Sequence, residues 1–213
     1  MYFFYRSFSD KIWPRGCISC VCRLETAEDF LCSTCLDHLE AAIAPRWENV
    51  TACASGYSWL DFDTPIVKNL MHQVKFGHVP DIARFLGALY AQRHCRPDVD
   101  ALVPIPLSKR RHFERGYNQS EWICKGLSDV WRLPILTKNL VKAHRPAQAK
   151  QNKSQRFLNQ NGAFSLIQGL PAGIRIQLWD DTWTTGVTLN EAAWTIQAAQ
   201  PITIHARSLT YAQ

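Results

Sequence analysis

Two adjacent carboxylates, Asp180 and Asp181, follow an apolar run and precede the turn-forming residues Thr-Thr-Gly at 184–186. If the run is a strand and a helix begins near Thr188, the free N–H groups of the turn meet at one spot, where the helix dipole favours an anion. The acids at the end of the strand can accept hydrogen bonds from the hydroxyls of a vicinal diol. The stretch therefore predicts a site for a ligand with both phosphate and hydroxyls, such as a ribose 5-phosphate unit. The alternative is that these residues only cap the turn and the helix.

A second group of reactive side chains lies near the start of the chain, where four cysteines form two C-x-x-C pairs separated by eleven residues. The four are Cys17, Cys20, Cys32 and Cys35. Pairs with this spacing turn their thiolates toward one point and supply the tetrahedral ligand set of zinc. We expect a structural zinc ion, because four protein thiolates leave no open position for water. Cys22 offers an alternative register for one ligand, and free thiols in a loop are the simpler alternative.

The composition is that of an ordinary folded protein. The chain has 213 residues and a mass of 24.4 kDa, with 46% hydrophobic and 20% charged residues, which excludes a disordered chain. The apolar start, MYFFYRSF, is interrupted by Arg6, so it predicts neither a signal peptide nor a membrane span, and we expect a cytoplasmic protein with reduced thiols. The net charge of +6 favours polyanions such as phosphate compounds or nucleic acid, with solubility as the plainer explanation.

The elements that must position these residues alternate between strands and helices along the chain. We expect helices at about 36–44, 64–76, 80–94, 118–131 and 188–199, and strands at about 49–59, 100–106, 139–143, 163–167, 174–179 and 202–209. This alternation predicts an α/β fold with a mostly parallel, doubly wound sheet, in which ligands bind beyond the carboxyl ends of the strands. We expect a small zinc-binding cysteine module at 1–48 and a main domain at 49–213.

The stretch at 180–188 resembles the phosphoribosyl-pyrophosphate (PRPP) loop of type I phosphoribosyltransferases. That loop is a hydrophobic run followed by D-D-x-x-T-T-G-x-T, and the match is complete. The resemblance implies that the acids bind the ribose hydroxyls and that the turn binds the 5-phosphate. The PRPP contacts implied in this loop are Asp180, Asp181, Thr182, Thr184, Thr185, Gly186 and Thr188.

Two further stretches narrow the resemblance to the ComF family. They are VPIPLSKRRHFERGYNQSE at 103–121 and RPAQAKQNKSQRFLNQNGAF at 145–164. Members of this family join a four-cysteine zinc module to a phosphoribosyltransferase domain, so the resemblance covers essentially the whole chain. It implies a type I phosphoribosyltransferase fold and a role in bringing transforming DNA into the cytoplasm of competent bacteria, alongside helicase-type proteins.

The stretch at 103–121 is similar to the pyrophosphate loop of the family. The resemblance implies PRPP contacts from Pro106, Leu107 and Ser108, and catalytic charge from Lys109 and Arg110 together with the acid pair. A magnesium ion bound with PRPP would bridge the pyrophosphate and the ribose. Such a site supports displacement of pyrophosphate from the anomeric carbon, with the charge of the leaving group neutralised by Lys, Arg and metal.

Two more PRPP contacts are implied outside that loop. Arg115 opens the R-G-Y-N-Q signature at 115–119, which either braces the pyrophosphate loop or lines the pocket. Gln148 matches a position in the mobile loop of the family, and the resemblance implies that this loop would close over the substrate and exclude water.

The sequence departs from the family pattern next to the acids, where Gln177 and Trp179 replace aliphatic residues and Trp183 lies inside the loop. These changes and the unidentified acceptor leave three interpretations open. The first is a PRPP-binding phosphoribosyltransferase. The second is a factor that binds single-stranded DNA and competence helicase-type proteins and keeps a non-catalytic PRPP pocket. The third is a structural module that binds a protein partner.

Overall fold

The strands expected from the sequence assemble into one five-stranded sheet in a computed structural model that describes residues 16–142 and 163–212. The order across the sheet is β1-β2-β7-β6-β3, and every neighbouring pair is parallel except β1 with β2. The five strands are β1 (Ile43–Glu48), β2 (Ser55–Asp61), β3 (Ala101–Pro104), β6 (Arg175–Trp183) and β7 (Thr203–Tyr211). A separate antiparallel pair joins β4 (Leu140–Lys142) to β5 (Phe164–Leu166). The predicted mostly parallel sheet is confirmed.

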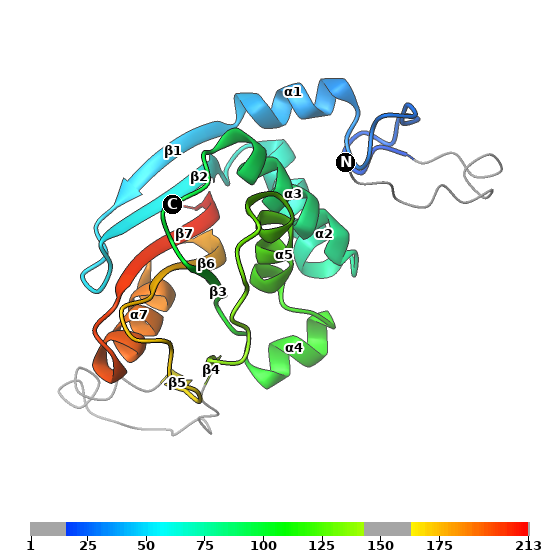
Figure 1. Cartoon of the computed structure of the whole chain (residues 1–213). Coiled ribbons are helices and arrows are strands. Elements are labelled where there is room, and N and C mark those ends of the chain that lie inside the picture. The colour runs from blue at the N-terminus through cyan, green and yellow to red at the C-terminus, as the bar shows by residue number, and fades with distance from the viewer. Residues whose placement is uncertain (1–15, 143–162, 213) are drawn as a thin grey trace.

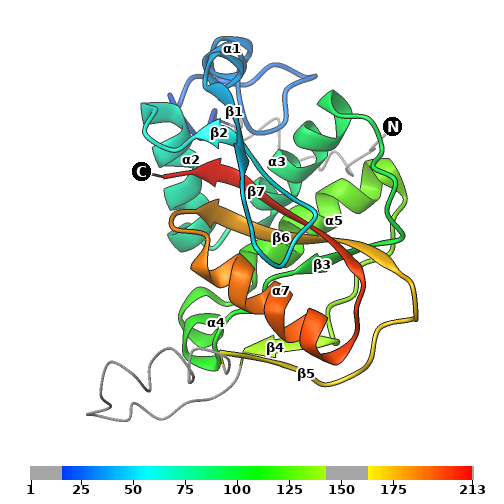
Figure 2. The same ribbon diagram turned by 90° about the vertical axis from the view of Figure 1, so that its left-hand side faces the viewer.

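Helices cover both faces of the sheet (Figure 1, Figure 2). They are α1 (Ser33–Ala41), α2 (Pro65–Phe76), α3 (Pro80–Arg93), α4 (Lys109–Arg115), α5 (Gln119–Trp131) and α7 (Val187–Ala199). One core forms where α2, α3 and α5 pack on strand residues that include Trp59, Trp179 and Leu209. A second core forms where Leu189 and Ile196 of α7 pack on the other face of β6 and β7. The α/β, doubly wound arrangement is therefore the one that the alternating pattern predicts.

Several element boundaries follow from local chemistry. The helices α2 and α3 begin at Pro65 and Pro80, because proline fits the first turn of a helix, whose N–H groups have no partner within the helix. The strand β6 continues to Trp183, four residues beyond its expected end at Trp179, because its pairing with β7 extends to Tyr211. The acid pair therefore lies inside the last part of β6.

The segment around Pro45 differs from the expectation. A helix at 36–44 that stops before this proline was expected, but α1 ends earlier and the chain is already extended at Ile43. Pro45 lies inside β1, where it is tolerated because β1 is the edge strand of the sheet and one of its sides needs no N–H donor.

The crossing of α3 and α5 depends on two glycines. A Cβ atom at Gly126 would lie 1.9 Å from the carbonyl oxygen of Arg84, and one at Gly87 would lie 2.2 Å from that of Ile123. The backbones of the two helices are therefore in direct contact. This contact fixes α5, whose first turn carries residues of the candidate site described below.

The cysteine segment packs on the same core as the sheet. Cys17, Leu24 and Leu31 belong to the apolar cluster that also contains α2, α3 and α5. The division into a module at 1–48 and a domain at 49–213 stays a prediction. In the part of the chain that the structure describes, each helix is too short or too polar to span a membrane.

Candidate functional site

The acid pair lies at the edge of the sheet where the carboxyl ends of the parallel strands meet. The side chains of Asp180 and Asp181 are both partly buried. Asp180 Oδ1 accepts one hydrogen bond from Ser120 Oγ of α5 at 3.2 Å and another from the backbone N–H of Asp181 at 2.9 Å. The first turn of α5 therefore fixes the orientation of the first acid.

A lysine that the sequence analysis missed contacts the second acid. Lys75 lies in the last turn of α2, and its Nζ is 3.6 Å from Asp181 Oδ2 and donates a hydrogen bond to Thr182 Oγ1 at 3.1 Å. The Lys75 side chain is 22% exposed and that of Asp181 is 14% exposed, so water screens the ion pair only in part. No local pattern marks Lys75, because Thr182 lies 107 positions further along the chain. Lys75 is nevertheless the cation closest to the acid pair in the described residues.

The protonation of the acid pair is set by its surroundings. Burial, together with the negative charge of Asp181, raises the pKa of Asp180 to about 7. The hydrogen bonds from Asp181 N and Ser120 and the positive charge of Lys75 act in the opposite direction. A ligand that donates hydrogen bonds to Asp180 therefore favours its ionised form near neutral pH. Asp181 Oδ2 is buried and accepts no hydrogen bond from the described residues, so it keeps acceptor capacity for a ligand.

The turn after the acid pair encloses a small cavity. Gly186, at φ +72°, directly precedes α7, and the buried indole of Trp183 packs beneath the turn, while Thr184 and Thr185 are exposed. The cavity is lined by Asp180, Thr182, Trp183, Thr184, Gly186, Thr188 and Leu189. Five of the seven predicted contacts in this loop thus share one cavity, whereas Asp181 and Thr185 do not line it.

The loop after β3 is held in place by the R-G-Y-N-Q residues. Asn118 Nδ2 donates a hydrogen bond to Ile105 O at 3.0 Å, and the Tyr117 hydroxyl donates one to Val74 O at 2.6 Å. The backbone N–H of Ile105 donates to Trp179 O at 2.8 Å. The signature therefore braces this loop against β6 and α2, which is one of the two roles expected for it.

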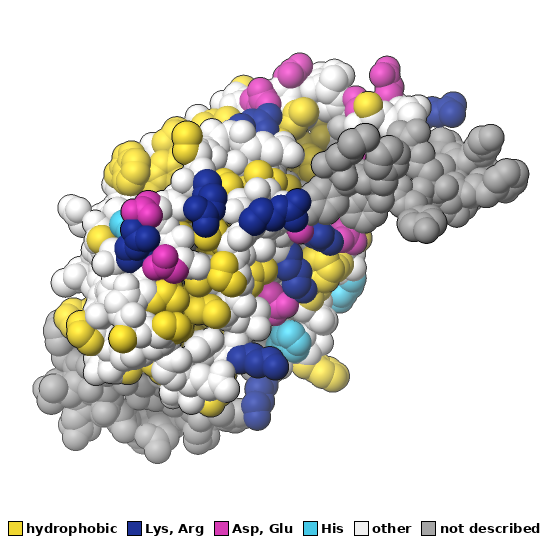
Figure 3. Space-filling view, in the orientation of Figure 1, with side chains coloured by type: hydrophobic (Ala, Val, Ile, Leu, Met, Phe, Trp, Pro, Cys, Tyr) yellow, Lys and Arg dark blue, Asp and Glu magenta, His cyan; other side chains and the backbone are white. Residues whose placement is uncertain are grey.

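The loop after β3 contains three predicted PRPP contacts, and all three are partly buried. They are Pro106, Leu107 and Ser108. Ser108 Oγ caps α4 by accepting a hydrogen bond from the backbone N–H of Arg111 at 3.3 Å. Lys109 and Arg110 are exposed on α4, over which Lys and Arg side chains gather in Figure 3. No hydrogen bond or ion pair between described residues joins Lys109 or Arg110 to the acid pair, and their catalytic role stays a prediction.

Two predicted contacts lie further out. Arg115 donates a hydrogen bond from NH1 to Gln119 Oε1 at 2.9 Å, and its guanidinium carbon lies 5.9 Å from the ring centroid of Phe76. These contacts place Arg115 beside the end of α2, and its contact with PRPP stays a prediction. Gln148 lies outside the described residues, so its role also stays a prediction.

The cysteine cluster contains three of the four expected ligands together with Cys22. The Sγ atoms of Cys17, Cys20, Cys22 and Cys32 lie within 4.8 Å of one another. Cys35, expected in place of Cys22, is buried in α1, and its thiol interacts with those of Cys17, Cys20 and Cys32. The backbone and thiol of Cys22 lower the pKa of Cys20 to about 6, toward the thiolate form that binds metals. Four thiolates at this spacing fit a structural metal site.

Several known proteins and solved structures are similar to this chain, whereas no protein-family model matches it. The chain is 30% identical to the DNA utilization protein YhgH of Salmonella typhimurium over 181 residues, which cover 81% of this chain and 74% of that protein. It is 34% identical to the competence protein ComFC of Bacillus subtilis over 113 residues, which cover 53% of this chain and 42% of that protein. Among solved structures it is similar to glutamine phosphoribosylpyrophosphate amidotransferase from B. subtilis, with a TM-score of 0.48, 16% identity, and coverage of 65% of this chain and 30% of that one.

Proposed function

Because this chain belongs to the ComF family, with the DNA utilization protein YhgH and the competence protein ComFC among its relatives, we propose that it binds PRPP or another ribose 5-phosphate ligand at the carboxyl end of β6. One observation carries the proposal. The partly buried acid pair is held by Lys75 and Ser120, and two residues after it a Thr-Thr-Gly turn encloses a cavity at the start of α7.

Different residues of this site bind different groups of the ligand. The carboxylates of Asp180 and Asp181 accept hydrogen bonds from the ribose hydroxyls, because ionised carboxylates are acceptors only. Thr184 and Gly186 present hydroxyl and backbone N–H groups to the 5-phosphate at the positive end of α7. Lys75 offsets the negative charge that two adjacent carboxylates would otherwise present to an anionic ligand.

A transferase reaction at this site would displace pyrophosphate from the anomeric carbon of the ribose. Lys109 and Arg110 on α4 would neutralise the charge that develops on the leaving pyrophosphate. A magnesium ion, if it arrives with PRPP, would supply further positive charge to the pyrophosphate oxygens. The protein's own part is to hold the ribose rigidly through the acid pair, since positioning accounts for much of the rate in a reaction with little covalent catalysis.

We also propose that the cysteine cluster holds a structural zinc ion. Cys17, Cys20 and Cys32 would supply three thiolates, and either Cys22 or Cys35 the fourth. Zinc would link residues 17–22 to the start of α1, a segment with few apolar residues of its own to bury.

A role in handling single-stranded DNA in the cytoplasm is the second candidate function, and one observation favours it. The helix α4 exposes Lys109, Arg110 and Arg111 beside Phe113, which is 91% exposed. Cations next to an exposed aromatic ring suit the backbone and bases of a single strand. Binding of a labelled oligonucleotide should weaken with a log-log salt slope of about −0.7 per phosphate neutralised. Binding that is absent at low salt, or that does not change with salt, contradicts this role and a DNA-linked partnership with helicase-type proteins.

Thermal unfolding in the presence of ligands tests the main proposal. PRPP with magnesium, at about 100 times its dissociation constant, should add about 2.7 kcal/mol to the free energy of unfolding, which is about 5–10 °C for a chain of this size. Ribose 5-phosphate should stabilise the protein as well, and pyrophosphate alone should do so less. In Asp180→Asn/Asp181→Asn the shift should fall to about half or less. An unchanged melting temperature of the folded wild-type protein with all three ligands contradicts the proposal.

A further inference from the structure

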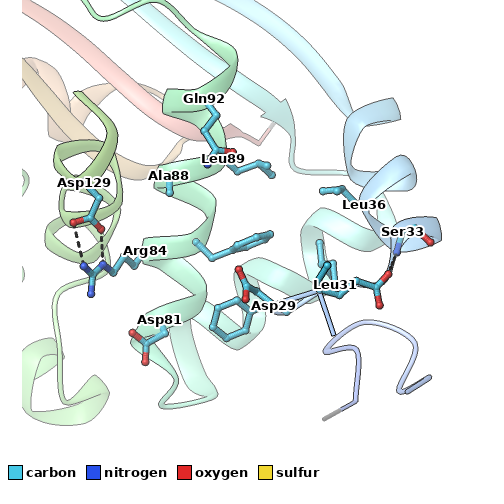
Figure 4. A pocket seen from close by; sticks show the side chains of 14 residues that line it. Asp29, Leu31, Ser33, Leu36, Asp81, Arg84, Ala88, Leu89, Gln92 and Asp129 are labelled. Atoms are coloured by element: carbon cyan, nitrogen blue, oxygen red, sulfur yellow. Dashed lines mark hydrogen bonds and ion pairs between the residues drawn. The ribbon is translucent and has the colours of Figure 1, made fainter. Parts of the chain in front are cut away.

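A cavity of about 550 Å³ lies between the cysteine segment and α3 (Figure 4). Residues 27–36 form one wall, with Leu31, Ser33 and Leu36 on that side in Figure 4. The helix α3 forms the facing wall, with Asp81 and Arg84. None of the residues that line this cavity belongs to the proposed PRPP site, so PRPP binding does not account for the cavity.

The floor of this cavity is apolar and aromatic. Phe30 and Phe85 face each other with ring centroids 5.4 Å apart, and Leu36 and Leu89 extend the apolar surface on either side. Both phenylalanines are only partly buried by the described residues. A concave apolar surface of this size is typical of a place where another side chain or ligand packs.

The rim of the cavity is acidic although the whole chain carries a net charge of +6. The lining holds four carboxylates, from Glu28, Asp29, Asp81 and Asp129, and one guanidinium, from Arg84, which gives a local net charge of −3 (−4 + 1). Glu28 is engaged locally, since it accepts hydrogen bonds from the backbone of residues 25 and 33. The described residues provide no ion pair for Asp29 or Asp81. An occupant that carries both aromatic rings and positive charge would therefore match this cavity.

Residues 1–15 of the same chain have this composition. The segment MYFFYRSFSDKIWPR contains six aromatic side chains in fifteen residues, three cations and one acid. The described chain begins directly beside the cavity, because the backbone N–H of Ile18 donates a hydrogen bond to the carbonyl oxygen of Phe30 at 3.0 Å. We propose that this cavity is the binding site for residues 1–15 of the same chain, whose aromatic side chains pack on Phe30 and Phe85 while its cations face Asp29 and Asp81.

Photo-crosslinking in the full chain tests the proposal. Two proteins would carry p-benzoylphenylalanine in place of Phe4 or of Phe8, and a third would carry it in place of Phe113, which is 91% exposed on α4. After irradiation, mass spectrometry of the digested monomer locates each cross-link. The first two proteins should cross-link within one chain to residues 27–36 or to α3, and the third should not. Neutralising the rim in Asp29→Asn/Asp81→Asn should lower the yield several-fold, whereas Asp37→Asn, on an exposed acid of α1 outside the cavity, should leave it unchanged.

Each other outcome overturns the proposal. Cross-links that join two chains would assign the cavity to a second copy, and cross-links to other parts of the same chain would place the segment elsewhere. The absence of any cross-link from both positions, with the same circular dichroism spectrum as the wild type, would show that the segment does not bind the protein. A yield unaffected by the rim substitutions and by about 1 M salt, where charges are screened within about 3 Å, would contradict the proposed contacts of the cations with Asp29 and Asp81 and so overturn the proposal as stated.

Discussion

The contacts of Lys75 make it the residue whose loss should most change ligand binding without changing the fold. In Lys75→Met the acid pair loses its cation and Thr182 loses a hydrogen-bond donor. Because a hydrogen bond to a charged group contributes about 1.5–3 kcal/mol, we expect PRPP affinity, measured by fluorescence or calorimetric titration, to fall by about 10- to 100-fold.

Lys68 on the same helix provides the matched control for Lys75. It forms an exposed ion pair with Asp63, in which both side chains are more than half exposed. Lys68→Met should therefore leave PRPP affinity and stability nearly unchanged. Equal affinities of Lys75→Met and Lys68→Met would show that the contact between α2 and the acid pair has no part in binding.

The raised pKa of Asp180 predicts a specific dependence of stability on pH. Between its ordinary pKa of 3.8 and its folded value of about 7, Asp180 keeps a proton in the folded protein that the unfolded chain has released. The free energy of unfolding should therefore fall as pH rises from about 4 to about 7, and this contribution should change no further above pH 7. The groups that face Asp180 are Asp181, Lys75 and Ser120, and of these Asp181 and Lys75 are charged.

Melting temperatures of the wild type and of Asp180→Asn, measured across this pH range, isolate the contribution of Asp180. The amide does not titrate, so the variant should gain stability relative to the wild type as pH rises toward 7. A constant difference between the two proteins across the range would show that the pKa of Asp180 is not raised.

The sequence predicts a residue of the site when the residues it acts with lie close to it along the chain. The acid pair and the Thr-Thr-Gly turn both lie within residues 180–186, so one short pattern contains the ligand contacts and the start of α7. Lys75 and Ser120 lie 107 and 60 positions before their hydrogen-bond partners Thr182 and Asp180, and no sequence pattern assigns either of them to the acid pair. Only the packing of α2 and α5 on the sheet brings them to the site.

At the scale of elements, the junction between β6 and α7 depends on the left-handed backbone of Gly186. Alanine at φ +72° costs about 1 kcal/mol, and its Cβ atom would also lie 3.0 Å from Trp183 Nε1 in the core. We expect Gly186→Ala to lower the free energy of unfolding by about 2 kcal/mol and to weaken the ligand-induced thermal shift, because the turn that faces the phosphate must move. Denaturant unfolding with and without PRPP measures both effects.

A substitution at Gly173 serves as a control that separates the cost of backbone strain at Gly186 from the cost of close packing against Trp183. Its φ is +70°, and a Cβ atom at this position would have no other atom within 4 Å. Gly173→Ala should therefore cost only the backbone contribution of about 1 kcal/mol and leave the ligand-induced shift intact. If the two variants had the same stability and the same response to ligand, close packing at the turn would have no consequence.

Elements were predicted best where local chemistry alone decides them. Proline at the first turn marks α2 and α3, and their starts agree with the structure. Pro45 was misleading, because a proline that stops a helix can also lie in an edge strand, and only the sheet order identifies β1 as an edge. The true end of β6 at Trp183 was equally hidden, since it depends on pairing with β7.

At the scale of the whole molecule, the cysteine segment should depend on its metal. We expect about one zinc ion per chain by elemental analysis, and chelation should lower the melting temperature because the folded segment loses a ligand that binds only the native state. Cys32→Ser should lose the metal, since Cys32 belongs both to the expected ligand set and to the observed cluster. Cys124→Ser, which alters a buried thiol of α5, should keep it.

Cys22→Ser and Cys35→Ser then identify the fourth ligand, because the variant that retains zinc has lost a cysteine outside the ligand set. A wild-type protein that is fully folded and stable without metal contradicts the zinc proposal. The two candidates differ in their surroundings, since Cys35 is buried in α1 and Cys22 is exposed. Sequence spacing favours Cys35 through the symmetric C-x-x-C pairs, whereas the structure groups the thiol of Cys22 with those of Cys17, Cys20 and Cys32 and also brings the Cys35 thiol to these three.

The central claim is that the acid pair and the turn after β6 form a binding site for a ribose 5-phosphate ligand. Calorimetric titration of PRPP and magnesium into the zinc-loaded full chain, beside the same titration of Asp180→Asn/Asp181→Asn, tests it most directly. We predict saturable binding at about one site per chain in the wild type and at least tenfold weaker binding in the variant, a difference of about 1.4 kcal/mol or more. Absence of binding to the folded wild type, or equal binding by both proteins, would contradict the claim.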